Sequence, residues 1–158
     1  MLTQDTESDA VKILIFNSTG DRSAEVLLAP LITLPFDKVI FCTNETKEED
    51  LASDNTNLNF SFEYAVRKCA SNKETWDRMQ KRLIDPTSTS SQVVTHIEDA
   101  LKSVDHHARD RPVKVFVTGS LHLVGGVLSF IHPNCFEKSA EELQTEKRII
   151  MKYSSLLK

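Results

Sequence analysis

The 158-residue sequence has few cysteines, few glycines and no long apolar run. Its three cysteines, Cys42, Cys69 and Cys135, lack CxxC spacing, which argues against a disulfide framework or a zinc site and favours a reducing compartment. No apolar run reaches the ~20 residues that a membrane span requires, and the polar residues 1–10 resemble neither a signal nor a transit peptide. The formal net charge of −4 favours neither nucleic acid nor an anionic membrane as a partner.

Standard catalytic and nucleotide-binding motifs are also missing. GxGxxG does not occur, and Gly119 and Gly125 are followed by no lysine in the GxxxxGK pattern. The adjacent His106 and His107 would point in different directions on a regular element, so they do not form a chelating pair. We therefore expect no ATP cradle, no metal site and no catalytic proton-transfer residue in this chain.

Apolar residues make up 40% and charged residues 27% of the sequence, which is typical of one soluble globular domain. The run at 11–16 is short, β-branched and almost wholly apolar, as in a strand buried on both faces. From Ser23 onward the apolar residues have helical spacing, and Pro30 should break that helix near Ala29. A second buried strand at 39–42 completes a βαβ unit over residues 11–43.

The middle of the sequence carries weaker signals. Residues 44–57 are polar and read as a loop, and Ser71 and Glu74 fit a capping box that would begin a helix. Residues 87–91 read as a hydroxyl-rich linker. A second amphipathic helix is predicted from five apolar residues at helical spacing, namely Val93, Val94, Ile97, Leu101 and Val104.

The last third returns to strong patterns. Residues 113–117 predict a buried strand, and the apolar stretch after Ser120 predicts a buried helix that ends at Ile131. Gly125 and Gly126 weaken that helix, so we expect them to allow close approach of a neighbouring element. Acidic residues precede basic ones in 137–158, which suits a helix there.

These elements predict an α/β fold with a mostly parallel sheet flanked by helices. We expect residues 1–10 to fray, residues 11–136 to form the domain with a variable insertion at about 44–92, and residues 137–158 to form a C-terminal helix.

In two places a buried strand runs into a glycine-containing turn that opens a helix. The first turn is Asn17 to Arg22, and the second is Thr118 to His122. Ligands gather at the carboxyl ends of parallel strands, and free N–H groups at a helix start suit a carboxylate or phosphate. Ser120 could add a hydroxyl donor and Arg22 a planar fork. The alternative is that each turn only reverses the chain and caps a helix.

The same two turns resemble a known family. The segments 16–22 (FNSTGDR) and 115–128 (VFVTGSLHLVGGVL) look like the GDR turn and the near-terminal VTGSLHLVGGVL block of eukaryotic folylpolyglutamate synthase. Phe36-Asp37 and the strand 39–42 also match that family. The similarity covers about residues 11–43 and 113–131. It implies the Rossmann-like C-terminal domain of a Mur-ligase-type enzyme, incomplete at its N-terminal end.

The resemblance implies an activity of which this chain would hold only part. Such ligases use ATP and Mg²⁺ to convert the folate γ-carboxyl to an acyl phosphate, which the amine of L-glutamate attacks. The P-loop, the Mg²⁺ ligands and the DGAH-type segment have no counterpart here, so an N-terminal ATPase domain would be a partner. We expect the chain alone to bind no ATP and to be inactive, and its location to be cytoplasmic, with the mitochondrion as the alternative.

The resemblance also implies site residues. Four residues would orient the glutamate, namely Asp21, Arg22, Ser120 and the N–H of Leu121. Their expected neighbours are Thr19, Gly20, Gly119 and His122. Two other readings stay open: a non-catalytic module that binds a carboxylate or phosphate, and an interaction partner that docks on a synthase through an exposed sheet edge.

Overall fold

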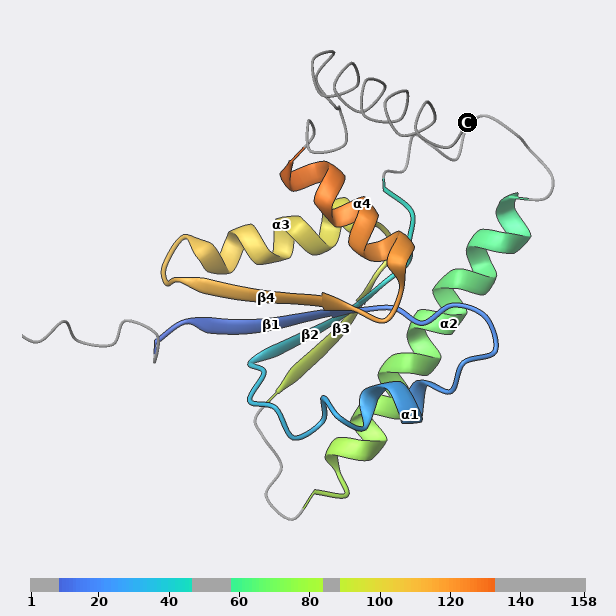
Figure 1. The fold of residues 1–158 in the computed structure, drawn as a ribbon, viewed down its shortest axis with the longest axis horizontal. Coiled ribbons are helices and arrows are strands. Elements are labelled where there is room, and N and C mark those ends of the chain that lie inside the picture. The colour runs from blue at the N-terminus through green and yellow to red at the C-terminus, as the bar shows by residue number, and fades with distance from the viewer. Residues whose placement is uncertain (1–8, 47–57, 84–88, 133–158) are drawn as a thin grey trace, which may run out of the picture. The chain divides into compact units, whose positions relative to one another are not determined.

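The computed structural model describes residues 9–46, 58–83 and 89–132. Four strands form one parallel sheet in the order β3-β2-β1-β4, namely β1 (Val11–Phe16), β2 (Lys38–Cys42), β3 (Ser90–Val94) and β4 (Val113–Thr118). Four helices join or follow them, namely α1 (Ala24–Leu28), α2 (Leu58–Gln80), α3 (Ile97–Ala108) and α4 (Leu121–Ile131). Figure 1 shows this α/β arrangement, which confirms the predicted fold class.

The central strands are buried on both faces, as their continuous apolar runs predicted. On one face, Leu14 and Phe16 of β1 pack with Val39 and Phe41 of β2 beneath α1 and α2. Phe16 and Phe41 meet edge to face with ring centroids 6.0 Å apart, a contact worth about 1 kcal/mol beyond its buried area. Trp76 of α2 is fully buried in the same cluster.

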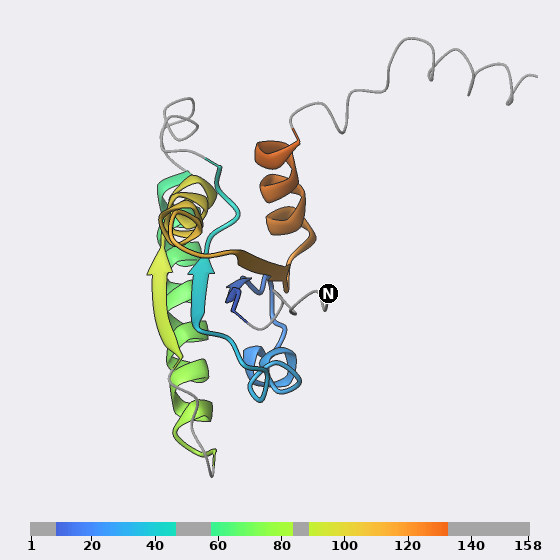
Figure 2. The ribbon, with the colours of Figure 1, turned by 90° about the vertical axis from the view of Figure 1, so that its left-hand side faces the viewer.

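The predicted βαβ unit is confirmed in detail. Ser23 is the N-cap of α1, and its side chain accepts a hydrogen bond from the backbone N of Val26 at 3.4 Å. The helix ends at Leu28, with Ala29 as its C-cap, immediately before Pro30. Strand β2 then pairs parallel to β1, and β3 pairs parallel to β2. Figure 2 shows the arrows of β2 and β3 running in the same direction.

Two expectations for the middle of the chain are wrong. No helix begins at Ser71, because α2 runs without a break from Leu58 to Gln80 and leaves Ser71 and Glu74 exposed on its surface. Buried Cys69 and Trp76, seven residues apart, carry the apolar stripe past the apparent capping box.

The second error concerns Val93 and Val94, which lie in β3 and not in a helix. Helix α3 begins only at Ile97. The strand was missed because two serines and a glutamine fill its first three positions, whereas its register with β2 is regular from Lys38↔Ser90 to Cys42↔Val94. Residues of the expected insertion at about 44–92 thus supply α2 and an edge strand of the sheet.

Helix α4 is less buried than its composition predicts. Of its residues only Leu123 and Val127 are buried, and Leu121 is 89% exposed. Gly126 does meet a neighbour, because a Cβ there would overlap the side chain of Ile97 in α3, but a Cβ at Gly125 would meet nothing. The chain divides into two units after Val127, and both glycine turns lie in the first unit. The expected helix at 137–158 lies outside the described residues, as does most of the expected frayed segment 1–10.

Candidate functional site

Both glycine turns leave the sheet at the carboxyl ends of their strands. Strands β1 and β4 are parallel neighbours, and their register places Phe16 opposite Thr118, so the turns that follow begin side by side. The Asn17 backbone N donates to the Thr118 carbonyl oxygen at 3.4 Å. The chain winds from β1 to β3 in one direction and then returns to add β4 on the other side of β1. The turns therefore occupy the switch point of the sheet, where open α/β folds bind ligands.

Gly119 fixes how closely the second turn approaches the first. Its φ is +95°, a conformation that side-chain-bearing residues rarely adopt. A Cβ at this position would also overlap the Asn17 carbonyl oxygen and the Phe16 ring. Gly20 in the first turn has a φ of +67°, but a Cβ there would meet open space. Glycine is therefore required at 119 both by the positive φ and by the close contact with the first turn, whereas at 20 it is required by the positive φ alone.

Arg22 links the two turns through its guanidinium. Nη2 donates to the Gly119 carbonyl oxygen at 2.8 Å and to Thr19 Oγ1 at 3.3 Å, and Nε donates to the Thr19 carbonyl oxygen at 3.3 Å. The Nη1 group makes no hydrogen bond to any residue that the structure describes, so its two N–H groups remain available. Arg22 therefore holds the turns together and still offers donors at their junction.

Ser120 is buried at the start of α4. Its Oγ accepts a hydrogen bond from the Leu123 backbone N at 3.4 Å, which is the geometry of a helix N-cap. The hydroxyl hydrogen is still free to donate to a ligand. Leu121 and His122 are the first residues of α4, where backbone N–H groups have no helical carbonyl to bond.

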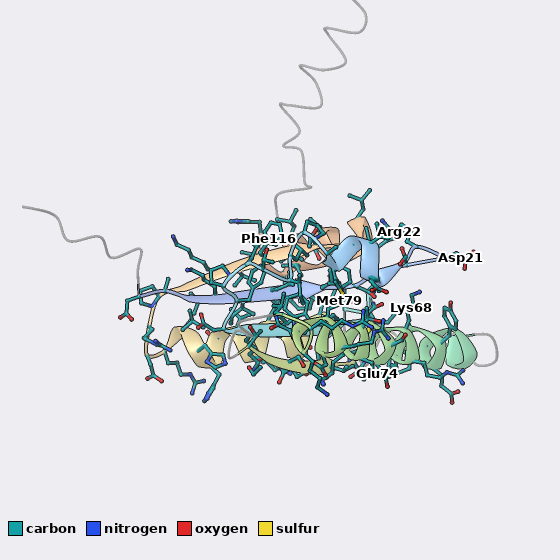
Figure 3. All side chains as sticks on the ribbon, turned by 90° about the horizontal axis from the view of Figure 1, so that it is seen from below. Asp21, Arg22, Lys68, Glu74, Met79 and Phe116 are labelled. Atoms are coloured by element: carbon teal, nitrogen blue, oxygen red, sulfur yellow. The ribbon has the colours of Figure 1, made fainter. Side chains whose placement is uncertain are left out.

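A pocket of about 490 Å³ lies between the turns, and we call it the turn pocket. Its walls are Thr19, Arg22, Leu27, Thr118, Gly119, Ser120, Leu121, His122 and Val124. Arginine, imidazole and hydroxyl groups line this space, and none of its described wall residues is acidic, so the pocket favours an anion. Six of the eight residues selected from the sequence line it. Gly20 lines a neighbouring pocket, and Asp21 lines neither, as its outward position in Figure 3 shows.

The neighbouring pocket was not found from the sequence. It measures about 210 Å³, and we call it the amide pocket after the two asparagines in its wall. Its walls are Asn17, Ser18, Thr19, Gly20, Asn44, Glu45, Tyr64, Ala65 and Lys68. Lys68 and Tyr64 come from α2, which begins at Leu58 and not at the predicted start at Ser71. The only sequence signal for this pocket was the polar run that follows β1.

Two cysteines, Cys42 and Cys69, are fully buried, and Cys69 Sγ donates to Oδ1 of the pocket residue Asn17 at 3.7 Å. Burial raises the pKa of the Cys42 thiol, with the nearby Cys69 adding to the effect. Burial likewise raises the pKa of Cys69 to about 12. Both shifts favour the protonated thiol, which is a weaker nucleophile than the thiolate. Among the described residues, no three His, Cys, Asp or Glu side chains gather to hold a metal ion, and no helix is long and apolar enough to span a membrane.

Comparison with known proteins gives one consistent result. The chain is 35% identical over 125 residues to folylpolyglutamate synthase of Saccharomyces cerevisiae, a match that covers 74% of this chain. The mitochondrial folylpolyglutamate synthases of Bos taurus and Homo sapiens are 28% and 25% identical, over 78% of this chain in each case. The chain is related to the folylpolyglutamate synthases.

This relationship covers only a fraction of each relative. The match spans 22% of the yeast folylpolyglutamate synthase and 30% of the bovine and human enzymes. No family model matches the chain, and no solved structure does. The expected resemblance to the folylpolyglutamate synthases is thus confirmed for a segment of these proteins.

Proposed function

We propose that this chain is the C-terminal, glutamate-binding part of a folylpolyglutamate synthase, and that the turn pocket holds a carboxylate of the incoming glutamate. One observation carries the proposal: Arg22 ties both glycine turns together at the switch point of the sheet, around a pocket whose described wall residues include donors and no acid. The relatives' name supplies the substrates, because a folylpolyglutamate synthase joins glutamate to folate.

The residues described here do not fit ATP or Mg²⁺. The chain has no GxxxxGK loop, and the described residues include no metal-binding cluster. In a complete folylpolyglutamate synthase, ATP and Mg²⁺ would bind a separate ATPase domain and activate the folate carboxyl there. The chain alone would therefore add no glutamate to folate, and turnover by the purified chain would contradict this part of the proposal.

The chain would orient the glutamate and would not transfer a proton. Arg22 Nη1, the Ser120 hydroxyl and the Leu121 backbone N–H would each donate to the glutamate carboxylate. A carboxylate held at several points leaves the amine little freedom to turn away from the acyl group that it attacks. Closure of this domain over the site would also keep water from the activated acid.

Like its bovine and human relatives, the protein would work in mitochondria, or alternatively in the cytoplasm.

The proposal is tested by substrate-specific kinetics in a complete enzyme that contains this segment. Ser120→Ala should raise the glutamate KM about tenfold or more and leave the ATP KM nearly unchanged, because one hydrogen bond to a charged group is worth about 1.5–3 kcal/mol. Ser23→Ala is the matched control, since Ser23 caps α1 with the same 3.4 Å geometry but does not line the turn pocket. Equal changes in both KM values would overturn the placement of glutamate.

One observation favours a second function, in which the chain docks on another protein. Strand β4 is at the edge of the sheet, and its Val115 and Phe116 are 40% and 48% exposed. Figure 3 labels Phe116 on this side of the molecule. Such an edge can pair with a further strand. Binding to a complete synthase that is lost in Phe116→Lys would support this function, and absence of binding would remove it.

A further inference from the structure

The turn pocket is larger than the carboxylate that it is proposed to hold. Its volume is about 490 Å³, and hydrogen-bond donors occupy only part of its wall. Leu27 of α1 and Val124 of α4 also line the pocket and offer aliphatic side chains. A bare anion such as formate would leave this apolar surface in contact with water. The pocket therefore suits an anionic group that is attached to an apolar chain.

Both aliphatic side chains are positioned by the helices that follow the glycine turns. Val124 lies one helical turn after Ser120, because its backbone N donates to the Ser120 carbonyl oxygen at 3.1 Å. Leu27 lies one turn after Ser23 in the same way, and it also packs against the buried core cluster. The pocket thus has an apolar wall next to the donors of the two turns.

The burial of the wall residues gives the pocket an inner and an outer end. Ser120 is 4% exposed and marks the inner end, whereas Leu27 and Val124 are half-buried. Leu121, which is 89% exposed, and the exposed His122 mark the outer end. A ligand whose carboxylate binds at the inner end would thus pass the apolar wall before it reaches solvent.

Only one end of a glutamate molecule has this order of groups. Its side-chain carboxylate is followed by two methylenes, whereas its α-carboxylate is joined directly to the carbon that bears the amine. We propose that the turn pocket binds the side-chain carboxylate of glutamate, with the two methylenes packed against Leu27 and Val124. This inference rests on the proposed function, because it states which carboxylate the pocket holds. It adds two specificity residues that were not among the site residues selected from the sequence.

This orientation leaves the α-amine at the exposed end of the pocket, where an acyl group can reach it. None of the described wall residues is acidic, so no carboxylate of the wall holds the amine as an ammonium. The positive charge of Arg22 disfavours a second cation nearby, and the ammonium releases one proton to solvent water. The amine lone pair then forms the C–N bond while the leaving phosphate takes the electron pair of the C–O bond. The remaining extra proton on the nitrogen also passes to solvent.

Three ligands distinguish the two carboxylates in binding to the 158-residue chain. We would titrate L-glutamate, 4-aminobutyrate and L-2-aminobutyrate and follow binding by NMR shifts. 4-Aminobutyrate keeps the side-chain carboxylate, the methylenes and the amine, whereas L-2-aminobutyrate keeps the α-carboxylate and the amine alone. We expect 4-aminobutyrate to bind within about threefold of L-glutamate, and L-2-aminobutyrate to bind about tenfold or more weakly, because it lacks the anion that accepts the hydrogen bonds.

Two variants test the apolar wall, and a neighbouring residue provides the matched control. Leu27→Ala and Val124→Thr should each weaken L-glutamate about fourfold, which is the effect of one methylene losing its apolar contact. Neither should change the binding of formate, which has no methylene. Val26→Ala should change nothing, since Val26 is 71% exposed on the same helix as Leu27 and does not line the pocket.

Thermal unfolding should show that all three variants keep the fold. Val124→Thr keeps the shape of valine, so it remains a test if Leu27→Ala disturbs the core. In the wild-type complex, NOEs should connect the glutamate Hβ and Hγ protons to the methyl groups of Leu27 and Val124.

The outcomes distinguish this inference from the proposed function. Binding of L-2-aminobutyrate that equals or exceeds that of 4-aminobutyrate would overturn the inference and place the α-carboxylate in the turn pocket, which leaves the proposed function in place. L-Glutamate binding that is lost in Arg22→Gln but unchanged in both Leu27→Ala and Val124→Thr would also overturn it. Failure of the wild-type chain to bind L-glutamate would overturn the proposed function itself.

Discussion

The two glycine turns follow adjacent parallel strands, yet different forces shape them. The second turn is held by packing, because Gly119 lies against the Asn17 carbonyl and the Phe16 ring with no room for a side chain. The first turn has open space at Gly20 and is held by hydrogen bonds, from Arg22 on one side and from the amides of Asn17 and Asn44 on the other. A site built from one packed wall and one hydrogen-bonded wall can stay rigid and still present polar groups to a ligand.

The largest difference between the turns should appear in stability. Gly119→Ala combines a positive φ with steric overlap, and we expect it to lower the free energy of unfolding by about 3 kcal/mol or more. Gly20→Ala carries only the φ penalty, so we expect a loss of about 1 kcal/mol. Urea denaturation of both variants measures the gap. Equal losses would show that packing at Gly119 is not what fixes the second turn.

The next difference concerns the two serine caps. Ser120→Ala should cost about 1 kcal/mol of stability, because Ser120 is buried and caps an 11-residue helix. Ser23→Ala should cost less, because Ser23 is exposed and caps a helix of five residues. Differential scanning calorimetry would rank the two. A larger loss for Ser23→Ala would contradict the view that the second turn is the more firmly fixed.

Arg22→Lys tests the bond that joins the turns. Lysine keeps the positive charge but cannot donate to Gly119 and Thr19 as a planar fork while leaving further donors free. We therefore expect about tenfold weaker L-glutamate binding with little change in thermal stability, since Arg22 is exposed. Isothermal titration calorimetry measures the first and thermal unfolding the second. Unchanged affinity would mean that charge alone, and not the fork, recognises the carboxylate.

The smallest effect should come from a contact remote from both turns. Burial raises the pKa of Asp77, but hydrogen bonds from Lys73 and Ser91 outweigh it and hold the pKa below its usual value. A lowered pKa stabilises the fold above the unfolded-state pKa of Asp, and the contribution disappears as the pH falls through the folded-state value. Asp77→Asn should thus reduce stability slightly at neutral pH and not at all in strong acid, leaving glutamate binding unchanged. Unfolding curves measured from neutral pH to strong acid test this prediction, and a loss of stability that does not disappear in acid would contradict it.

The sequence predicted the parts of the fold whose local and global signals agree. Strands 11–16 and 39–42 were recognised because strands buried on both faces need continuous apolar runs. Strand 113–117 was also recognised, but the expectation that it is buried is wrong, because it lies at the edge of the sheet and leaves Val115 and Phe116 exposed. Strand β3 was missed because its serines bond outward, with Ser91 Oγ donating to Asp77 and Ser90 Oγ to the Asp37 carbonyl oxygen. The apparent capping box at Ser71 gave a wrong helix start, because a four-residue motif does not show that the apolar face of α2 continues on both sides of it.

The candidate site divides in the same way. The turn pocket could be predicted, because parallel register forces the ends of β1 and β4 together. The amide pocket could not, because Lys68 reaches the first turn only through the length and docking of α2 on the sheet. The bridging role of Arg22 was also beyond the sequence, since its partner Gly119 is 97 residues away.

The most direct test is a titration of the isotope-labelled chain with L-glutamate, followed at the backbone amides of Leu121 and His122 and at the Arg22 side chain. We predict saturable shifts of these groups, with smaller changes on the exposed face of α2. Shifts that are confined to other regions, or no saturable shift at any of the three, would contradict a glutamate site between the two turns.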